Sequence, residues 1–191
     1  MRGIKLIGLT VILAVLQGCA AAVVGGGAAT GAAVAVDRRT TGAMIDDQGI
    51  EFKASSEIYK NKDIHDQSHI NVTSFNGVVL VTGETPSAAL KKSVTNIIQD
   101  IPRVRKVYNE LAILAPSAVA SRTSDTWITS KVKSKLLADK TTKGLNTKVV
   151  TERGIVYLMG KIKRNESDNV VRVVRSTGGV QKVVKVFEYI D

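Results

Sequence analysis

The hydrophobic and polar positions beyond residue 45 predict a unit of mixed helix and strand. Apolar residues recur at helical spacing in two segments, at about residues 48–60 and 90–101. Between them, residues 70–84 contain alternating and continuous runs of β-branched residues that are typical of strands, and a last apolar run covers residues 104–114. The pattern therefore predicts a helix, two strands, a helix and a final strand, in that order.

A second unit repeats this order with a nearly constant offset. INVTSFNGVVLVTGE at 70–84 aligns with TKVVTERGIVYLMGK at 147–161. A helix is predicted ahead of the second hairpin at about residues 125–139. A second helix contains Val170, Val171 and Val174, and the last strand covers residues 180–190. The chain is therefore an internal duplication.

Glycines occupy matching positions in the two copies. Asn76-Gly77 between two apolar runs is a strong hairpin signal, and Arg153-Gly154 keeps only the glycine of that turn. Positive φ or close packing would exclude a side chain where each hairpin turns and where its second strand continues. We expect purely structural roles for Gly77, Gly83, Gly154 and Gly160.

Each copy is predicted to form a three-stranded sheet covered on one face by two helices, so the fold class is α+β. The expected domains span residues 46–115 and 124–191, joined by a linker at 116–123 that contains Pro116. Domains of about 70 residues are near the lower limit for an independent hydrophobic core.

The N-terminus has the features of an export signal. Two positive charges precede an apolar run at residues 6–16 that is too short to span a bilayer. Leu16-Gln17-Gly18-Cys19 then resembles the bacterial lipobox, which implies a signal peptide at 1–18 and lipidation of Cys19. Ala20 after the cysteine, in place of Asp, resembles the signal for outer-membrane sorting. An ordinary signal peptide with an unrelated cysteine is the alternative.

Residues 19–45 are predicted to be a lipid-anchored tether of low complexity. As a Gly-rich flexible coil, residues 20–45 would reach roughly 25–30 Å, which keeps the folded part near the membrane surface. A marginal second membrane segment is the alternative interpretation, although four glycines in its apolar part disfavour a helix.

Charge separates the two copies. The whole chain carries +10, and removal of residues 1–18 leaves +8. Residues 46–115 carry 8 basic and 9 acidic residues, a net charge of −1, whereas residues 124–191 carry 14 and 7, a net charge of +7. A basic domain favours an anionic membrane or nucleic acid. The export signal, and the few aromatic residues among the basic ones, exclude nucleic acid; a merely solvated basic face is the alternative.

Nothing in the sequence indicates catalysis or a metal site. The two histidines, His65 and His69, have no third His or free Cys to complete a zinc site, which usually needs three or four protein ligands. No nucleophile elbow or phosphate-binding loop occurs. We expect no enzyme activity, no metal and no cofactor other than covalent lipid at Cys19.

The predicted helix at 125–139 is the candidate membrane-binding element. Ile128, Val132 and Leu136 form one stripe that would face the sheet. The expected lipid-binding residues lie on or beside the opposite face: Trp127, Ser130, Lys131, Lys133, Ser134, Lys135, Leu137 and Ala138. An exposed Trp rimmed by lysines suits the headgroup region of an anionic bilayer. The alternative is that Trp127 packs against the first domain, for example against Phe75.

The motifs together resemble one family. NGVVLVTGE followed by VRKVYNEL, and RGIVYLMGK followed by GVQKVVKVF, resemble the BON domain, although Arg103 replaces the glycine before the final strand. With the lipobox and the tether, the whole chain resembles the dual BON-domain outer-membrane lipoproteins of the DolP type. The resemblance implies a non-enzymatic, periplasm-facing lipoprotein that binds anionic, phosphatidylglycerol-like phospholipid through the 125–139 helix and supports outer-membrane integrity. The alternative is a structural adaptor that docks envelope proteins; a monomer is favoured.

Overall fold

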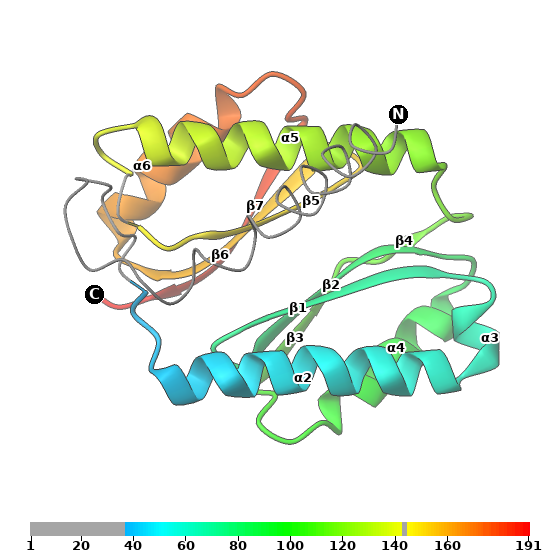
Figure 1. Cartoon of the computed structure of the whole chain (residues 1–191). Helices are drawn as coiled ribbons and strands as arrows, with labels where there is room; N and C mark the ends of the chain where they lie inside the picture. The colour runs from blue at the N-terminus through cyan, green and yellow to red at the C-terminus, as the bar shows by residue number, and fades with distance from the viewer. Residues whose placement is uncertain (1–36, 143–144) are drawn as a thin grey trace, which may run out of the picture. The chain divides into compact units, whose positions relative to one another are not determined.

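The computed structural model of the chain describes residues 37–142 and 145–191. The predicted signal peptide, Cys19 and the tether up to residue 36 lie outside the described residues. Two repeats follow along the chain, coloured from blue to green and from green to red in Figure 1.

The first repeat begins with a long helix and ends with an interrupted strand. Its elements are α2 (Thr41–Lys60), α3 (Lys62–His65), β1 (His69–Phe75), β2 (Val78–Thr85), α4 (Ala88–Gln99), β3 (Lys106–Asn109) and β4 (Ala112–Ile113). β1 and β2 are antiparallel, with Phe75 opposite Val78 across the hairpin turn. β3 and β4 both run parallel to β2. Asn76 (φ 53°) and Gly77 (φ 72°) form the turn, as the Asn-Gly signal predicts.

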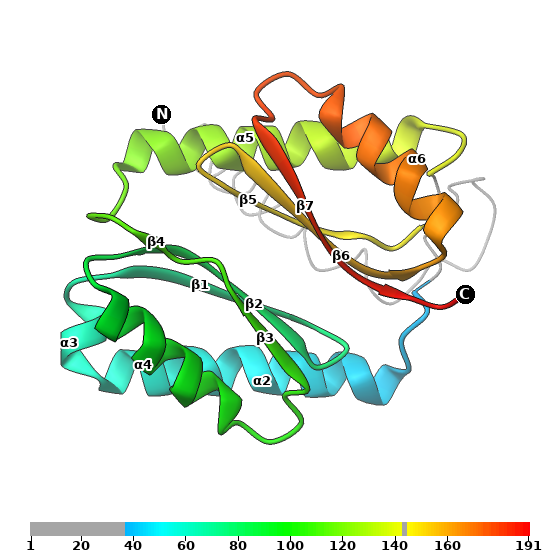
Figure 2. The ribbon, with the colours of Figure 1, turned by 180° about the vertical axis from the view of Figure 1, so that it is seen from behind.

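The second repeat has the same order without the interruption. Its elements are α5 (Val119–Ala138), β5 (Lys148–Glu152), β6 (Ile155–Ile162), α6 (Arg164–Arg175) and β7 (Lys182–Tyr189). β5 pairs with β6 antiparallel, and β6 pairs with β7 parallel. The α+β prediction with two domains of helix, two strands, helix and strand is confirmed. Figure 2 shows β7, β3, α4 and α6 from behind.

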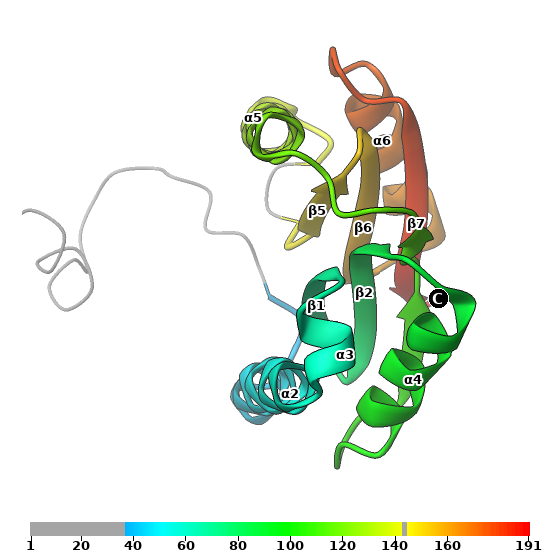
Figure 3. The same cartoon turned by 90° about the vertical axis from the view of Figure 1, so that its right-hand side faces the viewer.

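Each sheet has two buried faces. In β2, Val79 and Val81 pack with α2 and α4, while Leu80 points to the opposite face; in β6, Val156 and Leu158 alternate in the same way with Tyr157 and Met159. The second faces meet in a shared core formed by Phe75, Leu80, Tyr157, Met159 and Val186. Figure 3 shows the two sheets stacked between α2 and α4 on one side and α5 and α6 on the other. The continuous apolar runs of β2 and β6 therefore report burial on both faces.

Three boundaries differ from the sequence prediction. α2 begins at Thr41, inside the predicted tether, because the side chain of Thr40 accepts the N–H of Ala43 and caps the helix. α5 begins at Val119, inside the predicted linker, and its exposed first turns lack the apolar periodicity that marks the rest. The strand predicted at 104–114 is split into β3 and β4, which makes the first sheet four-stranded, because Asn109 accepts the N–H of Leu111 at the break.

Candidate functional site

The buried side of α5 determines which residues the helix shows to solvent. Ile128, Val132 and Leu136 are buried against the sheet, as predicted. Trp127 and Leu137 project from the outer side and are 66% and 62% exposed. Trp127 is therefore separated from Phe75, which is 3% exposed in the core between the sheets, and the alternative that pairs these two aromatic side chains is wrong.

The lysines of α5 lie on both flanks of this outer face. Lys131 donates to the carbonyl oxygen of Gly178 at 2.7 Å, and Lys135 donates to that of Ser176 at 2.8 Å, so both are held by the loop between α6 and β7. The Lys131 ammonium also lies 5.9 Å from the centroid of the Trp127 ring. Lys133 lies on the other flank, beside a cavity that is also lined by His69 and Asn71 of β1.

The small residues predicted for this surface are also exposed. Ser130, Ser134 and Ala138 lie on the exposed part of α5, where Ser130 donates to the carbonyl oxygen of Thr126 at 3.0 Å. The predicted set thus forms one outer surface of α5 that combines a tryptophan, a leucine, small side chains and three lysines. Such a surface can contact an interfacial lipid layer without unfolding any part of the core.

An aspartate on the first helix of each repeat bonds that helix to the hairpin turn. Asp125 accepts the backbone N–H groups of Arg153 and Gly154, both at 2.8 Å. Asp47 accepts those of Asn76 and Gly77 at 2.7 and 2.8 Å. The sequence analysis missed both aspartates; the available signal was an acidic residue at the start of each buried helical stripe.

Hydrogen bonding keeps the Asp47 carboxylate charged. Burial alone would raise the pKa of Asp47, but hydrogen bonds from Gly77, Ser74 and Asn76 and the contact with Arg39 outweigh it and lower the pKa below its usual value. The surrounding donors therefore stabilise the ionised form of Asp47, and charge-assisted hydrogen bonds hold the hairpin turn.

The four glycines at matching positions of the two repeats do not have equal roles. Gly77 and Gly154 adopt φ of 72° and 73° in the turns. Gly83 has φ of 117°, and a Cβ there would collide with the carbonyl oxygen of His69. Gly160 has no positive φ, and its Cβ would lie 3.2 Å from the carbonyl oxygen of Asn146.

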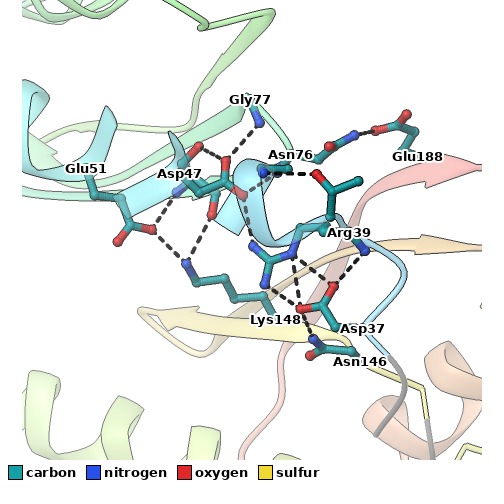
Figure 4. Close-up of polar contacts among 12 residues, drawn as sticks. Asp37, Arg39, Asp47, Glu51, Asn76, Gly77, Asn146, Lys148 and Glu188 are labelled. Carbon is teal, nitrogen blue, oxygen red and sulfur yellow. Dashed lines mark hydrogen bonds and ion pairs between the residues drawn. The ribbon is translucent and has the colours of Figure 1, made fainter. Parts of the chain in front are cut away.

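A polar network joins the two repeats beside the shared apolar core. Lys148 of β5 donates to Glu51 of α2 at 2.7 Å and to the carbonyl oxygen of Ser74 at 3.0 Å. Asn76 donates to Glu188 of β7 at 2.7 Å (Figure 4). The repeats therefore form one folded unit, and removal of either would expose the apolar faces of β2 or β6.

Residues just before α2 are part of this unit. Arg38 forms two hydrogen bonds with Glu166 at the start of α6, at 2.7 and 2.8 Å, and the hydrogen bond from Arg38 lowers the pKa of Glu166 to about 2. Asp37 bridges Arg39 and Asn146, as Figure 4 shows. Asp37 and Arg38, which the sequence assigned to the tether, are bonded to the second repeat, and Arg39 is bonded to Asp47 of the first.

Carboxylates are also buried where the two repeats meet. Glu84 is fully buried, with Oε2 accepting the N–H of Ser117 at 3.2 Å and Oε1 3.7 Å from Arg153. Burial raises the pKa of Glu152, and the charges of Glu84 and Asp125 raise it further against the opposing hydrogen bond from Asn71.

Neither a metal cluster nor a membrane-spanning helix occurs in the described part of the chain. Across residues 37–142 and 145–191, no group of three or more His, Cys, Asp or Glu side chains is placed to hold a metal ion. Within the same residues, no helix has the length and hydropathy needed to cross a bilayer.

Comparison with known proteins finds relatives over nearly the full length. The BON domain matches residues 46–115 and 124–191. The chain is 39% identical to the outer membrane lipoprotein DolP of Haemophilus influenzae over 97% of this chain and 94% of that protein. It is 35% identical to a 21 kDa hemolysin of Actinobacillus pleuropneumoniae over 82% of this chain and 80% of that protein. It is 27% identical to the osmotically inducible protein Y of Escherichia coli over 74% of this chain and 72% of that protein.

Proposed function

Because the chain belongs to the BON-domain family, as a dual-domain outer-membrane lipoprotein of the DolP type, we propose that it binds anionic phospholipid through the outer surface of α5. The family is non-enzymatic. In this proposal, lipid on Cys19 anchors the chain in the outer membrane, the repeats face the periplasm, and the contact made by α5 supports membrane integrity.

One observation carries the proposal. Trp127 and Leu137 stay exposed although α5 already buries a complete apolar stripe, so neither side chain is needed to cover the core. A bilayer interface supplies the missing environment, because an indole is stable at headgroup depth and each nearby lysine contributes about 1 kcal/mol at an anionic surface. The acyl anchor would provide most of the attachment, and α5 would select orientation and neighbouring lipid.

The test uses the chain from residue 20 onward, because the shared core makes an isolated second repeat unsuitable. Trp127 is the single tryptophan, so its fluorescence reports on α5 directly. We expect a blue shift of the parent chain with vesicles of phosphatidylglycerol and phosphatidylethanolamine, and loss of vesicle co-sedimentation in Trp127→Glu, which no longer contains a tryptophan. Tyr59→Glu is the matched control, because Tyr59 is 68% exposed on the corresponding helix of the first repeat. An unshifted spectrum with these vesicles would reject the proposal.

Neutralisation of the lysine charges separates the apolar and electrostatic contributions. Replacement of Lys131, Lys133 and Lys135 by Gln is expected to weaken vesicle binding mainly at low salt, where charges are least screened. Equal weakening at high salt would instead indicate damage to the fold, since Lys131 and Lys135 also bond to the α6–β7 loop.

An adaptor function is the second candidate, favoured by the outer surface of α2. Ile45, Phe52 and Tyr59 lie seven residues apart on this helix and are 65%, 77% and 68% exposed. α2 lies on the outer side opposite α5 (Figure 3), so this stripe would face away from a membrane bound by α5. If Phe52→Glu disrupts outer-membrane integrity in cells while vesicle binding is unchanged, the adaptor function is supported.

A further inference from the structure

The outer side of α2 carries a seven-residue repeat of small and large side chains. Small residues recur every seven positions, and a large apolar residue follows each of them after three positions. The small residues are Gly42, Gly49 and Ser56, and the large ones are Ile45, Phe52 and Tyr59. Alternate spacings of three and four residues place all six positions along one side of a helix. We call this side, with these six residues, the heptad face of α2.

The two glycines of the heptad face have no structural role within the described residues. Gly49 lies in the interior of α2, where glycine costs about 1 kcal/mol relative to alanine. A Cβ at Gly49 would have no atom within 4 Å, and a Cβ at Gly42 would lie 3.9 Å from Oγ1 of Thr40. Neither glycine has positive φ. The close approach of a second helix would explain a glycine at such a position.

The small residues leave a depression beside projecting side chains. A hollow of about 430 Å³ adjoins Ile45 and Gly49, and Pro102 and Arg103 form another part of its wall. Helices pair when the projecting side chains of one fit the hollows of the other. A surface that carries both features can fit a second copy of itself across a two-fold axis, because such an interface uses the same surface on both copies.

The repeat fits itself in antiparallel order. If Tyr59 of a second copy lies opposite Gly49, then Phe52 of that copy lies opposite Ser56, because Phe52 precedes Tyr59 by seven residues and Ser56 follows Gly49 by seven. The two-fold axis repeats both contacts. Every aromatic side chain then meets a small residue. In parallel order, Phe52 would instead lie at the level of its own copy, and the glycines would face each other across a gap.

Charge also favours antiparallel order through the first repeat. Asp46 lies near the start of α2, and Lys60 is its last residue. In the register above, Asp46 lies within about 3 Å of helix rise from the level of Lys60 of the second copy. Parallel order would place like charges together. The net charge of residues 46–115 is −1, so this contact keeps apart the second repeats, which carry +7 each.

We propose that two copies of the chain associate through the heptad faces of their α2 helices, in antiparallel order. This replaces the monomer expected from the sequence. α2 has 20 residues and is therefore about 30 Å long. Such a helix pair is expected to bury less than the roughly 1,200 Å² of a stable interface, so the association should be reversible. It goes beyond the proposed function and does not depend on it, because α5 belongs to the opposite helix layer (Figure 3).

Sedimentation velocity without lipid tests the association. We expect the chain from residue 20 onward to form dimers at protein concentrations up to about 0.5 mM, which detects a dissociation constant of roughly 1 mM or tighter. Gly49→Leu should weaken the dimer at least about tenfold, because a large side chain at the small position overpacks the contact. The same substitution adds exposed apolar surface, so non-specific association would become stronger. An unchanged or stronger dimer in Gly49→Leu would overturn the proposal.

Gly49→Leu is suited to this test because it should not unfold the chain. A side chain at this position has free space, and leucine favours a helix more than glycine does. The thermal midpoint is therefore expected to stay the same or rise. Gly178→Leu is the matched control, because a Cβ at Gly178 also has no atom within 4 Å and this residue lies outside α2. It should leave the dimer unchanged.

Cross-linking tests the antiparallel order. The chain from residue 20 onward contains no cysteine, so a single cysteine can be introduced at one position. In the proposed register the two copies of residue 53 lie about 3 Å apart along the helix axis, whereas those of residue 60 lie about 18 Å apart. We expect a short bifunctional maleimide to link Lys53→Cys to itself and to link Lys60→Cys much less. Equal linking of both variants would overturn the antiparallel order.

The association and the proposed membrane contact fail independently. A Trp127 blue shift with vesicles, in a chain that stays monomeric at every concentration, would reject the association and leave the outer surface of α2 to the adaptor function. Dimers without a blue shift would retain the association and reject the membrane contact of α5.

Discussion

The carboxylate of Asp125 accepts the backbone N–H of Gly154 at 2.8 Å, which bonds the first helix of the second repeat to its hairpin turn. Asp47 and Gly77 make the same contact in the first repeat, also at 2.8 Å. Since both copies keep it, the contact belongs to the architecture of the repeat. It also fixes the helix register that leaves Trp127 on the outer side of α5.

Removal of this carboxylate should destabilise the fold. Asp125→Ala leaves the buried N–H of Gly154 and that of Arg153 without partners, which is expected to cost about 2–4 kcal/mol. Urea unfolding of the chain from residue 20 onward measures the change. Asp168→Ala, at an exposed position on α6, is the control and should change stability by less than about 0.5 kcal/mol. An unchanged midpoint for Asp125→Ala would contradict the assigned role.

Gly83 and Gly160 lie in the second strand of each hairpin, and substitution by Ala should destabilise the chain to different extents at the two positions. Gly83→Ala is expected to cost about 3 kcal/mol or more, because positive φ and the His69 carbonyl both oppose a side chain. Gly160→Ala should cost about 1 kcal/mol, because its backbone is not strained and its neighbour lies at 3.2 Å. Thermal unfolding measures both, and equal losses would show that sequence position alone determines their role.

Arg103 stands where the second repeat has Gly179, and both adopt positive φ, 72° and 99°. Arg103→Gly should therefore stabilise the chain by about 0.5–1 kcal/mol. Its ion pair with Asp46 offsets little, since the Arg103 side chain is 69% exposed. Gly179→Arg is the reciprocal variant and should destabilise, because a Cβ there would lie 2.9 Å from Ile128. Destabilisation by Arg103→Gly would indicate that the ion pair outweighs backbone strain.

The contact between Arg38 and Glu166 predicts a dependence of stability on acid. Because the hydrogen bond from Arg38 lowers the pKa of Glu166 from 4.5 to about 2, its contribution is fully present above pH 4.5 and is lost as the pH falls toward 2. Denaturant unfolding between pH 2 and 6 should show a shallower loss in Glu166→Gln than in the parent chain. Asp168→Asn is the control and should retain the parent profile.

Local sequence determined the elements of each repeat. Alternating and continuous β-branched runs specified β1, β2, β5 and β6, and Asn76-Gly77 specified the turn, because strand and turn preferences depend on neighbours a few residues away. The stripe of Ile128, Val132 and Leu136 specified the inner side of α5 for the same reason. The duplication then showed that both units share one α+β topology.

Tertiary structure decided which of these elements pack against one another. No local pattern states that Leu80 and Met159 belong to one shared core, because an apolar position records burial without naming its partner. The bonds of Asp37 and Arg38 to the second repeat and the cavity between β1 and α5 depend on groups distant in sequence. The sequence by itself therefore determined two similar domains and a candidate surface on α5. Only the packing of the sheets, which buries their second faces, decided that the two domains act as one unit.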